Sequence, residues 1–97
     1  LRELPPPELV TLAQLQADFG LPVLAYETLT ELLKRQETDD VYRKRAQVLQ
    51  QLKRYSDARR DLQRAIVLNP QAPVSRLALV ELTAQPLHWR MLIHFYA

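Results

Sequence analysis

The sequence predicts an all-α fold of about six short antiparallel helices. Apolar residues recur at three- and four-residue steps along most of the chain, a spacing that places them on one face of a helix. The 97 residues include a single glycine, which argues against the tight turns of a β-rich chain. Proline-containing breaks separate the periodic segments. The links between segments are short, which predicts antiparallel hairpins rather than a long bundle.

The first two helices are predicted over residues 7–19 and 22–35. Pro7 suits the first turn of a helix, where its missing N–H costs nothing. The expected apolar stripe of the first helix comprises Leu9, Leu12, Ala13, Leu15 and Phe19. Gly20 and Pro22 break the chain before the second helix. The expected apolar face of that helix comprises Ala25, Leu29, Leu32 and Leu33.

Two further helices are predicted over residues 39–52 and 56–68. Thr38, followed by two aspartates, is a good N-cap for the first of these. Lys53 and Arg54 form a short break, and Asn69–Pro70 ends the fourth helix.

Residues 73–82 and 87–96 are predicted as the fifth and sixth helices, separated by Pro86. The sixth is apolar on more than one side, and exposed apolar patches commonly mark interfaces. Its candidate interface residues are Trp89, Met91, Leu92 and Phe95. We expect this surface to meet either further chain of a longer protein or a second copy through self-association. The sequence also starts without an initiator methionine, and we therefore expect it to be a piece of a longer protein.

Composition excludes several classes of protein. Without cysteine the chain has no disulfide and no cysteine-based zinc site, and no apolar run reaches the ~18 residues of a membrane span. The formal net charge is only +2, yet most of the thirteen Lys and Arg residues lie within residues 34–64. Such asymmetry is typical of a surface for nucleic acid or an acidic partner, or else of solvated helix faces.

Residues 39–70 carry the most specific pattern in the chain. Small and large residues alternate there as Tyr42-x₂-Arg45-Ala46-x₂-Leu49, then Ala58-x₃-Leu62, with Ala65 and a closing Pro70. This segment resembles a tetratricopeptide repeat (TPR), a helical hairpin that stacks into an α-α superhelix. Small side chains let the two helix axes approach where they cross. Arg45 departs from the pattern, and its stem is expected to lie along the hairpin with its head in water.

The pattern recurs more weakly on either side. When Ala13 is aligned with Ala46, the repeat positions upstream are occupied by Leu9, Leu12, Ala13, Ala25, Leu29 and Leu32. We therefore expect a single TPR-like domain over residues 1–97. Its parts are a degenerate repeat at 7–37, a second repeat at 39–70, and a divergent third hairpin or cap at 72–97. Val74, Leu77 and Ala78 are candidates to begin the third unit.

The resemblance implies a protein–protein interaction module that binds a peptide or partner helix in a concave groove. The first helix of each hairpin lines that groove in the family. The implied groove residues are Asp40, Arg43, Lys44, Gln47, Gln50 and Gln51 in the second unit, and Val10, Gln14 and Ala17 in the first. The cations and amides favour an acidic or polar peptide. On the second helix, Arg59, Arg60 and Arg64 are expected to face outward, near enough to Asp57 and Asp61 to pair.

Two other classes remain as alternatives. One is a structural or oligomerisation domain of a larger assembly or secretion protein. The other is a single-stranded RNA binder using residues 34–64, which is disfavoured because few aromatic residues accompany the cations. Catalysis has no support: no phosphate loop, nucleophile motif or zinc spacing appears, and His88 and His94 are poorly spaced to share a metal. No cofactor is expected.

Overall fold

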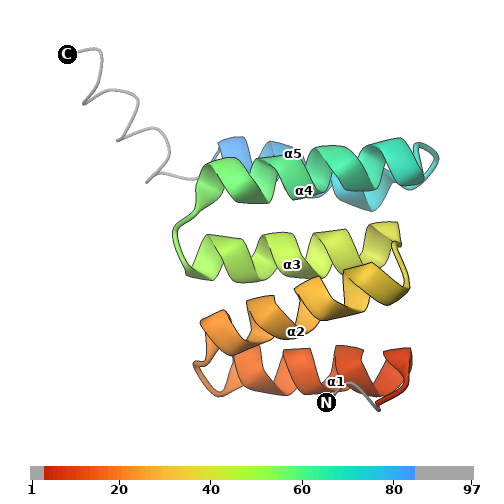
Figure 1. The fold of residues 1–97 in the computed structure, drawn as a ribbon. Coiled ribbons are helices and arrows are strands. Elements are labelled where there is room, and N and C mark those ends of the chain that lie inside the picture. Colours follow the sequence, from red (N-terminus) through yellow and green to blue (C-terminus); the bar gives the residue numbers. More distant parts are fainter. Residues whose placement is uncertain (1–3, 85–97) are drawn as a thin grey trace.

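The computed structural model describes residues 4–84, which form five α-helices and no strand (Figure 1). The helices are α1 (Pro6–Asp18), α2 (Pro22–Arg35), α3 (Asp39–Gln51), α4 (Tyr55–Leu68) and α5 (Pro73–Thr83). The predicted all-α fold is confirmed, and each helix begins and ends within about one residue of its predicted bounds. The predicted sixth helix lies outside the described residues, and so do Trp89, Met91, Leu92 and Phe95.

Consecutive helices pack against each other and build a one-dimensional stack. The helices α1 and α2 form an antiparallel hairpin, here called hairpin 1, and α3 and α4 form hairpin 2. Hairpin 2 joins hairpin 1 through α2 and α3, and α5 packs against α4 and more lightly against α3. In Figure 1 the helices α1 to α4 follow one another up the picture, with α5 behind α4.

The same turn closes both hairpins. Gly20 after α1 and Lys53 after α3 have φ angles of 77° and 60°, the left-handed region. The next N–H in each case bonds back toward the helix, from Leu21 to Gln16 and from Arg54 to Leu49, both at 2.8 Å. This is the Schellman arrangement that ends many helices. Gly20 and Lys53 are equivalent when Ala13 is aligned with Ala46, so the two hairpins share one backbone plan.

Small residues lie at the helix crossings, as the repeat pattern predicts. Ala46, Ala58 and Ala65 are completely buried in hairpin 2. The equivalent positions one repeat earlier, Ala13, Ala25 and Leu32, are buried in hairpin 1. The predicted packing positions are therefore confirmed in both hairpins.

Two residues assigned to the apolar stripe of α1 are not in the core. Leu15 is 48% exposed and Phe19 is 78% exposed. The equivalent residues one repeat later, Val48 and Leu52, pack against hairpin 1. Among the described helices only α2 packs extensively on α1, so the equivalent side of α1 has no such cover. The prediction was wrong for Leu15 and Phe19 because it could not include the stacking direction.

The helix α5 also uses a different face from the expected one. Val74 and Leu77 are more than half exposed, whereas Ser75 and Leu82 are buried and Ala78 is half-buried. When α5 is aligned on α3 by burial, Ser75 and Leu82 correspond to Val41 and Val48, which are buried as well. The expected start of a third unit at Val74 and Leu77 was therefore out of register. A buried serine gave no apolar signal in the sequence.

Arg45 is a partly buried ion-pair residue, contrary to the expectation that its head would lie in water. Its side chain is 17% exposed and pairs with Asp61, which is 7% exposed. Its Nε and Nη2 donate to the two carboxylate oxygens of Asp61 at 2.8 and 2.7 Å, and Nη1 donates to Thr30 at 3.2 Å. The hydrogen bonds to Asp61 raise the pKa of Arg45, so the residue stays charged. This contact joins α2, α3 and α4.

Two aromatic rings complete the surroundings of Arg45. Its guanidinium carbon lies 5.4 Å from the ring centroid of Tyr26 and 5.6 Å from that of Tyr42, within cation–π range. The arginine that departs from the repeat pattern therefore fills an interior position, with its charge neutralised by one carboxylate and covered by two rings.

Candidate functional site

Two hollows lie on either side of α3, one between α1 and α3 and the other between α3 and α5. The α1–α3 hollow is lined by Ala13, Gln14, Ala17, Leu29, Lys44, Gln47, Val48 and Gln51. The α3–α5 hollow is lined by Asp40, Arg43, Lys44, Ala46, Gln47, Gln50, Leu62, Val74 and Ala78. Lys44 and Gln47 belong to both, so α3 forms the ridge between the hollows. We call this surface of α1, α3 and α5 the groove face.

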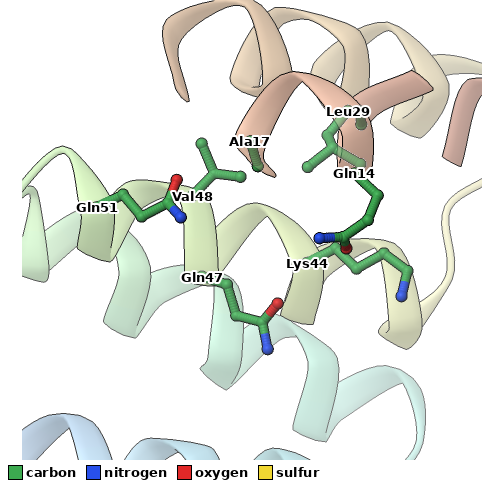
Figure 2. Close-up of a pocket in the computed structure, with 8 residues that line it drawn as sticks. Gln14, Ala17, Leu29, Lys44, Gln47, Val48 and Gln51 are labelled. Atoms are coloured by element: carbon green, nitrogen blue, oxygen red, sulfur yellow. The ribbon is translucent and has the colours of Figure 1, made fainter. Parts of the chain in front are cut away.

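The α1–α3 hollow combines an apolar floor with a polar rim. Ala13, Leu29 and Val48 are buried residues of the core at its base. Figure 2 shows Gln51 at one end and Gln14 with Lys44 at the other, with Val48 and Ala17 between them. Such a site can enclose one small apolar side chain and offer hydrogen bonds around it.

The two hollows are built from equivalent positions. Ala13, Gln14, Ala17 and Leu29 of the first recur one repeat later as Ala46, Gln47, Gln50 and Leu62 of the second. On the opposite wall, the alignment of α5 on α3 makes Lys44 of the first equivalent to Ala78 of the second. The two hollows are therefore lined at positions that share one spacing along the chain, and the side chains at those positions differ.

Arg43 is engaged within the protein. Its Nη1 donates to Asp39 at 2.6 Å and to Ser75 at 3.0 Å, and its Nη2 donates to Asp40 at 3.3 Å. Asn69 also donates to Asp39, at 3.4 Å. The bond from Arg43 lowers the pKa of Asp39 most strongly among its causes. Arg43 thus links α3 to α5, which accounts for the buried Ser75.

Lys44 is the more available cation. Its Nζ lies 3.6 Å from Asp40, beyond hydrogen-bond distance, and its side chain is 32% exposed. Asp40 is already shared with Arg43. A carboxylate brought to the ridge of α3 therefore competes with only one weak ion pair at Lys44.

The structure brings most of the predicted groove residues together. Gln14, Lys44, Gln47 and Gln51 line the α1–α3 hollow, and Asp40, Arg43 and Gln50 join the α3–α5 hollow. Val10 lines neither and packs against the core of hairpin 1. Ligand binding by any of these residues stays a prediction. Sequence reasoning missed the floor residues Leu29, Val48 and Leu62, because a core position gives the same apolar signal whether or not a hollow reaches it.

The arginines of α4 lie away from both hollows, and their pairing differs from the expectation. Arg60 is 80% exposed and lies 3.9 Å from Asp57. Arg64 instead donates to Glu37 at 3.1 Å, and the Tyr42 hydroxyl donates to the same carboxylate at 3.0 Å. These bonds lower the pKa of Glu37. The expected pairing of Asp61 with the arginines of its own helix was wrong, because Asp61 holds Arg45.

Most cations of the basic segment take part in ion pairs within the protein, although the segment keeps an excess of positive charge. Within residues 34–64, ion pairs involve Lys34, Arg43, Lys44, Arg45, Arg54, Arg60 and Arg64. In the part of the chain that the structure describes, no group of His, Cys, Asp and Glu residues could hold a metal ion. None of the five helices has both the length and the apolar character needed to cross a membrane.

Comparison with known proteins identifies the class of hairpin 2. Residues 39–72 match the family model of the tetratricopeptide repeat. The chain therefore contains a TPR, made of α3, α4 and the linker after α4, and the resemblance read from its alanines is confirmed. No curated protein and no solved structure matched the chain. TPRs generally act as protein–protein interaction modules on non-enzymatic scaffolds, and this supports an interaction role in general.

Proposed function

We propose that this protein binds a segment of a partner protein across its groove face. The observation that carries the proposal is the recurrence of two hollows at equivalent positions of successive units. A periodic, partly apolar surface can contact a ligand chain at regular intervals, as repeat proteins do along their extended faces. The partner segment would lie over Gln14, Lys44, Gln47 and Gln51 and reach α5.

The same proposal treats residues 7–37 as a degenerate first repeat and α5 as the start of a third unit. The support is that buried alanines and the left-handed residues Gly20 and Lys53 recur at one common spacing. The match of Ser75 and Leu82 to Val41 and Val48 extends the periodicity into α5. A groove of two hollows needs these three first helices.

Site-specific photo-crosslinking tests the location. A benzophenone amino acid at Gln47, on the ridge, is compared with the same group at Gln63, which is exposed on α4 and lines neither hollow. In extracts of the source cells we expect a crosslinked partner from position 47 and not from position 63. Capture from position 63 alone would move the binding surface to α4.

The oligomerisation alternative gives a different product in the same experiment. If the domain serves to join copies of the chain, the crosslink from Gln47 will connect two copies of this protein, and its yield will rise with protein concentration. No observation specifically favours RNA binding, because seven of the ten cations in residues 34–64 lie in ion pairs.

A further inference from the structure

One side of α1 is apolar although none of the other described helices covers it. In Figure 1, α1 is the lowest of the labelled helices, and α2 to α5 all lie above it. Glu8, Leu12, Leu15 and Phe19 follow one another at three- and four-residue steps, so they share one side of this helix. Leu15 and Phe19 are exposed there, whereas the end units of repeat proteins normally show a polar outer face. We call these four residues the α1 edge.

The corresponding side of α3 indicates what kind of element fits the α1 edge. One repeat later, Glu8, Leu15 and Phe19 correspond to Val41, Val48 and Leu52. Those three residues belong to the core of hairpin 1 or pack against it, and α2 is the helix that covers them. The covering element is therefore an amphipathic helix, whose buried residues also recur at three- and four-residue steps.

Negative charge distinguishes the α1 edge from its covered counterpart on α3. Glu8 stands where α3 has the buried Val41, and within residues 4–84 Glu8 forms no ion pair. Asp18, three residues after Leu15, accepts a hydrogen bond from the Gln14 amide but also pairs with no cation of the described chain. Residues 4–33 contain four acids and no Lys, Arg or His. A helix that covers this edge must bring its own cations, because burying an unpaired carboxylate is costly.

The same charges argue against a symmetric pairing of two copies through the α1 edge. A two-fold interface joins one surface to itself, so it would bring only acids toward Glu8 and Asp18. Like charges facing each other across an interface weaken it, whereas opposite charges stabilise it and fix the partner's position. A basic partner therefore fits this edge better than a second copy does.

We infer that the α1 edge docks an amphipathic helix of a partner protein, which packs its apolar stripe on Leu15 and Phe19 and pairs lysine or arginine side chains with Glu8 and Asp18. The two acids are ten residues apart, about 15 Å along a helix. The partner's cations are therefore two to three turns apart, with aliphatic residues at three- and four-residue steps between them. This surface is separate from the groove face, so the inference does not depend on the proposed function.

Selection from a phage-displayed library of helix-forming peptides, with the purified protein as the target, supplies the probes. Enriched peptides are synthesised with a fluorescent label and titrated by anisotropy. We expect one enriched group to be amphipathic, with Lys or Arg toward both ends of an aliphatic stripe. Because such a peptide docks by its helical face, difference circular dichroism is expected to show a gain of helix on binding.

Two variants test the apolar and the ionic contacts separately. Phe19→Ser removes the most exposed apolar side chain of the edge and is expected to weaken binding of this group roughly tenfold. Glu8→Gln is expected to weaken it roughly two- to fivefold and to flatten its salt dependence, as for a partly exposed ion pair. Val67→Ser on α4 and Glu27→Gln on α2 are the matched controls at exposed positions away from the edge, and both should keep the parent affinity. Thermal unfolding checks that each variant is folded.

Basic peptides that gain helix and lose affinity in both Phe19→Ser and Glu8→Gln support the inference. It is overturned if no enriched peptide loses affinity in folded Phe19→Ser protein. It is also overturned if the peptides that depend on Phe19 lack cations, ignore Glu8→Gln or gain no helix. Sedimentation velocity examines the remaining occupant: a parent protein that self-associates, and that Phe19→Ser makes monomeric, covers this edge with a second copy and contradicts the inference. None of these outcomes changes the crosslinking expected from Gln47, which tests the groove face.

Discussion

Hairpins 1 and 2 share a backbone plan but fill it with different chemistry. At equivalent positions, Leu9 and Leu12 of α1 are replaced by Tyr42 and Arg45 of α3, and Thr28 of α2 is replaced by Asp61 of α4. In hairpin 1 the buried Thr28 donates to Gln16 at 2.8 Å beside an apolar core. In hairpin 2 the same place holds a bidentate ion pair.

The difference shows which positions define the hairpin and which merely fill it. Alanines at the crossings and the left-handed residue at the turn are alike in both, whereas the interior beside them is apolar in one and ionic in the other. A buried ion pair is also asymmetric energetically. Removing one partner leaves a charge unpaired, but replacing both with apolar groups is often neutral.

The largest expected effect comes from Asp61→Ala. It leaves the Arg45 guanidinium buried beside Tyr26 and Tyr42 without its carboxylate, and we expect a loss of about 3–5 kcal/mol of unfolding free energy. The equivalent change in hairpin 1, Thr28→Ala, removes one neutral hydrogen bond and should cost about 1 kcal/mol. Urea unfolding followed by far-UV circular dichroism measures both.

A double variant sharpens this contrast. Arg45→Leu combined with Asp61→Thr places the hairpin 1 residues at these two positions of hairpin 2, and we expect it to recover most of the loss of Asp61→Ala. If the double variant is as unstable as the single one, the ion pair is not interchangeable with apolar packing, and the two hairpins differ in more than their filling.

The second prediction concerns the crossings, where the hairpins are alike. Ala58→Leu and Ala25→Leu each add a large side chain at a position with no exposed surface. Overpacking is expected to cost roughly 1–3 kcal/mol in either hairpin. The comparable surface change Gln63→Leu should leave the melting temperature nearly unchanged. An unaltered melting temperature in Ala58→Leu would contradict the crossing assignment.

The turns predict effects of opposite sign. Gly20→Ala puts a side chain on a left-handed backbone and should cost about 1 kcal/mol, although space is available, since no atom lies within 4 Å of the new Cβ. Lys53→Gly relieves the same constraint in hairpin 2 and should stabilise it by a few tenths to about 1 kcal/mol. If chemical denaturation shows that both substitutions change the free energy of unfolding in the same direction, the two turns are not equivalent.

The smallest predicted effect is a change in how the stability of the fold depends on pH in acid. The pKa of Asp39 is lowered in the folded protein, mainly by the hydrogen bond from Arg43, so this bond stabilises the fold fully above the ordinary aspartate pKa of 3.8. The contribution is lost as the pH falls through the lowered value. Asp39→Asn should therefore flatten the decline of stability between about pH 5 and pH 2. Glu27→Gln, an exposed charge removal on α2, is the control and should keep the parent slope.

Local signals made the helices predictable, and tertiary partners did not follow from them. Pro22, the Thr38 cap and Asn69–Pro70 mark helix ends through their own backbone chemistry, and Val41 N–H does bond to Thr38 Oγ1 at 3.3 Å. The location of Arg45 could not be read in this way, because its partner lies on another helix, far along the chain.

The candidate site was predictable to a similar degree. Helical spacing and the repeat pattern placed Gln14, Lys44 and Gln47 on one surface, and the structure brings them together. The spacing and the repeat pattern gave no information on whether Arg43 or Lys44 would form ion pairs and hydrogen bonds within the protein. Arg43 is held by Asp39 and by Ser75, and Ser75 lies on a helix whose buried face was not evident from the apolar pattern.

The Arg45–Asp61 contact also limits which substitutions this sequence can accept in evolution. A small domain has only about 5–15 kcal/mol of stability in total. Changing either residue alone removes a large part of that margin, while the paired exchange avoids the penalty. Replacing this pair with apolar residues one substitution at a time would therefore pass through an unstable single variant. Among descendants of this chain we expect Arg45 and Asp61 to be kept together or replaced together.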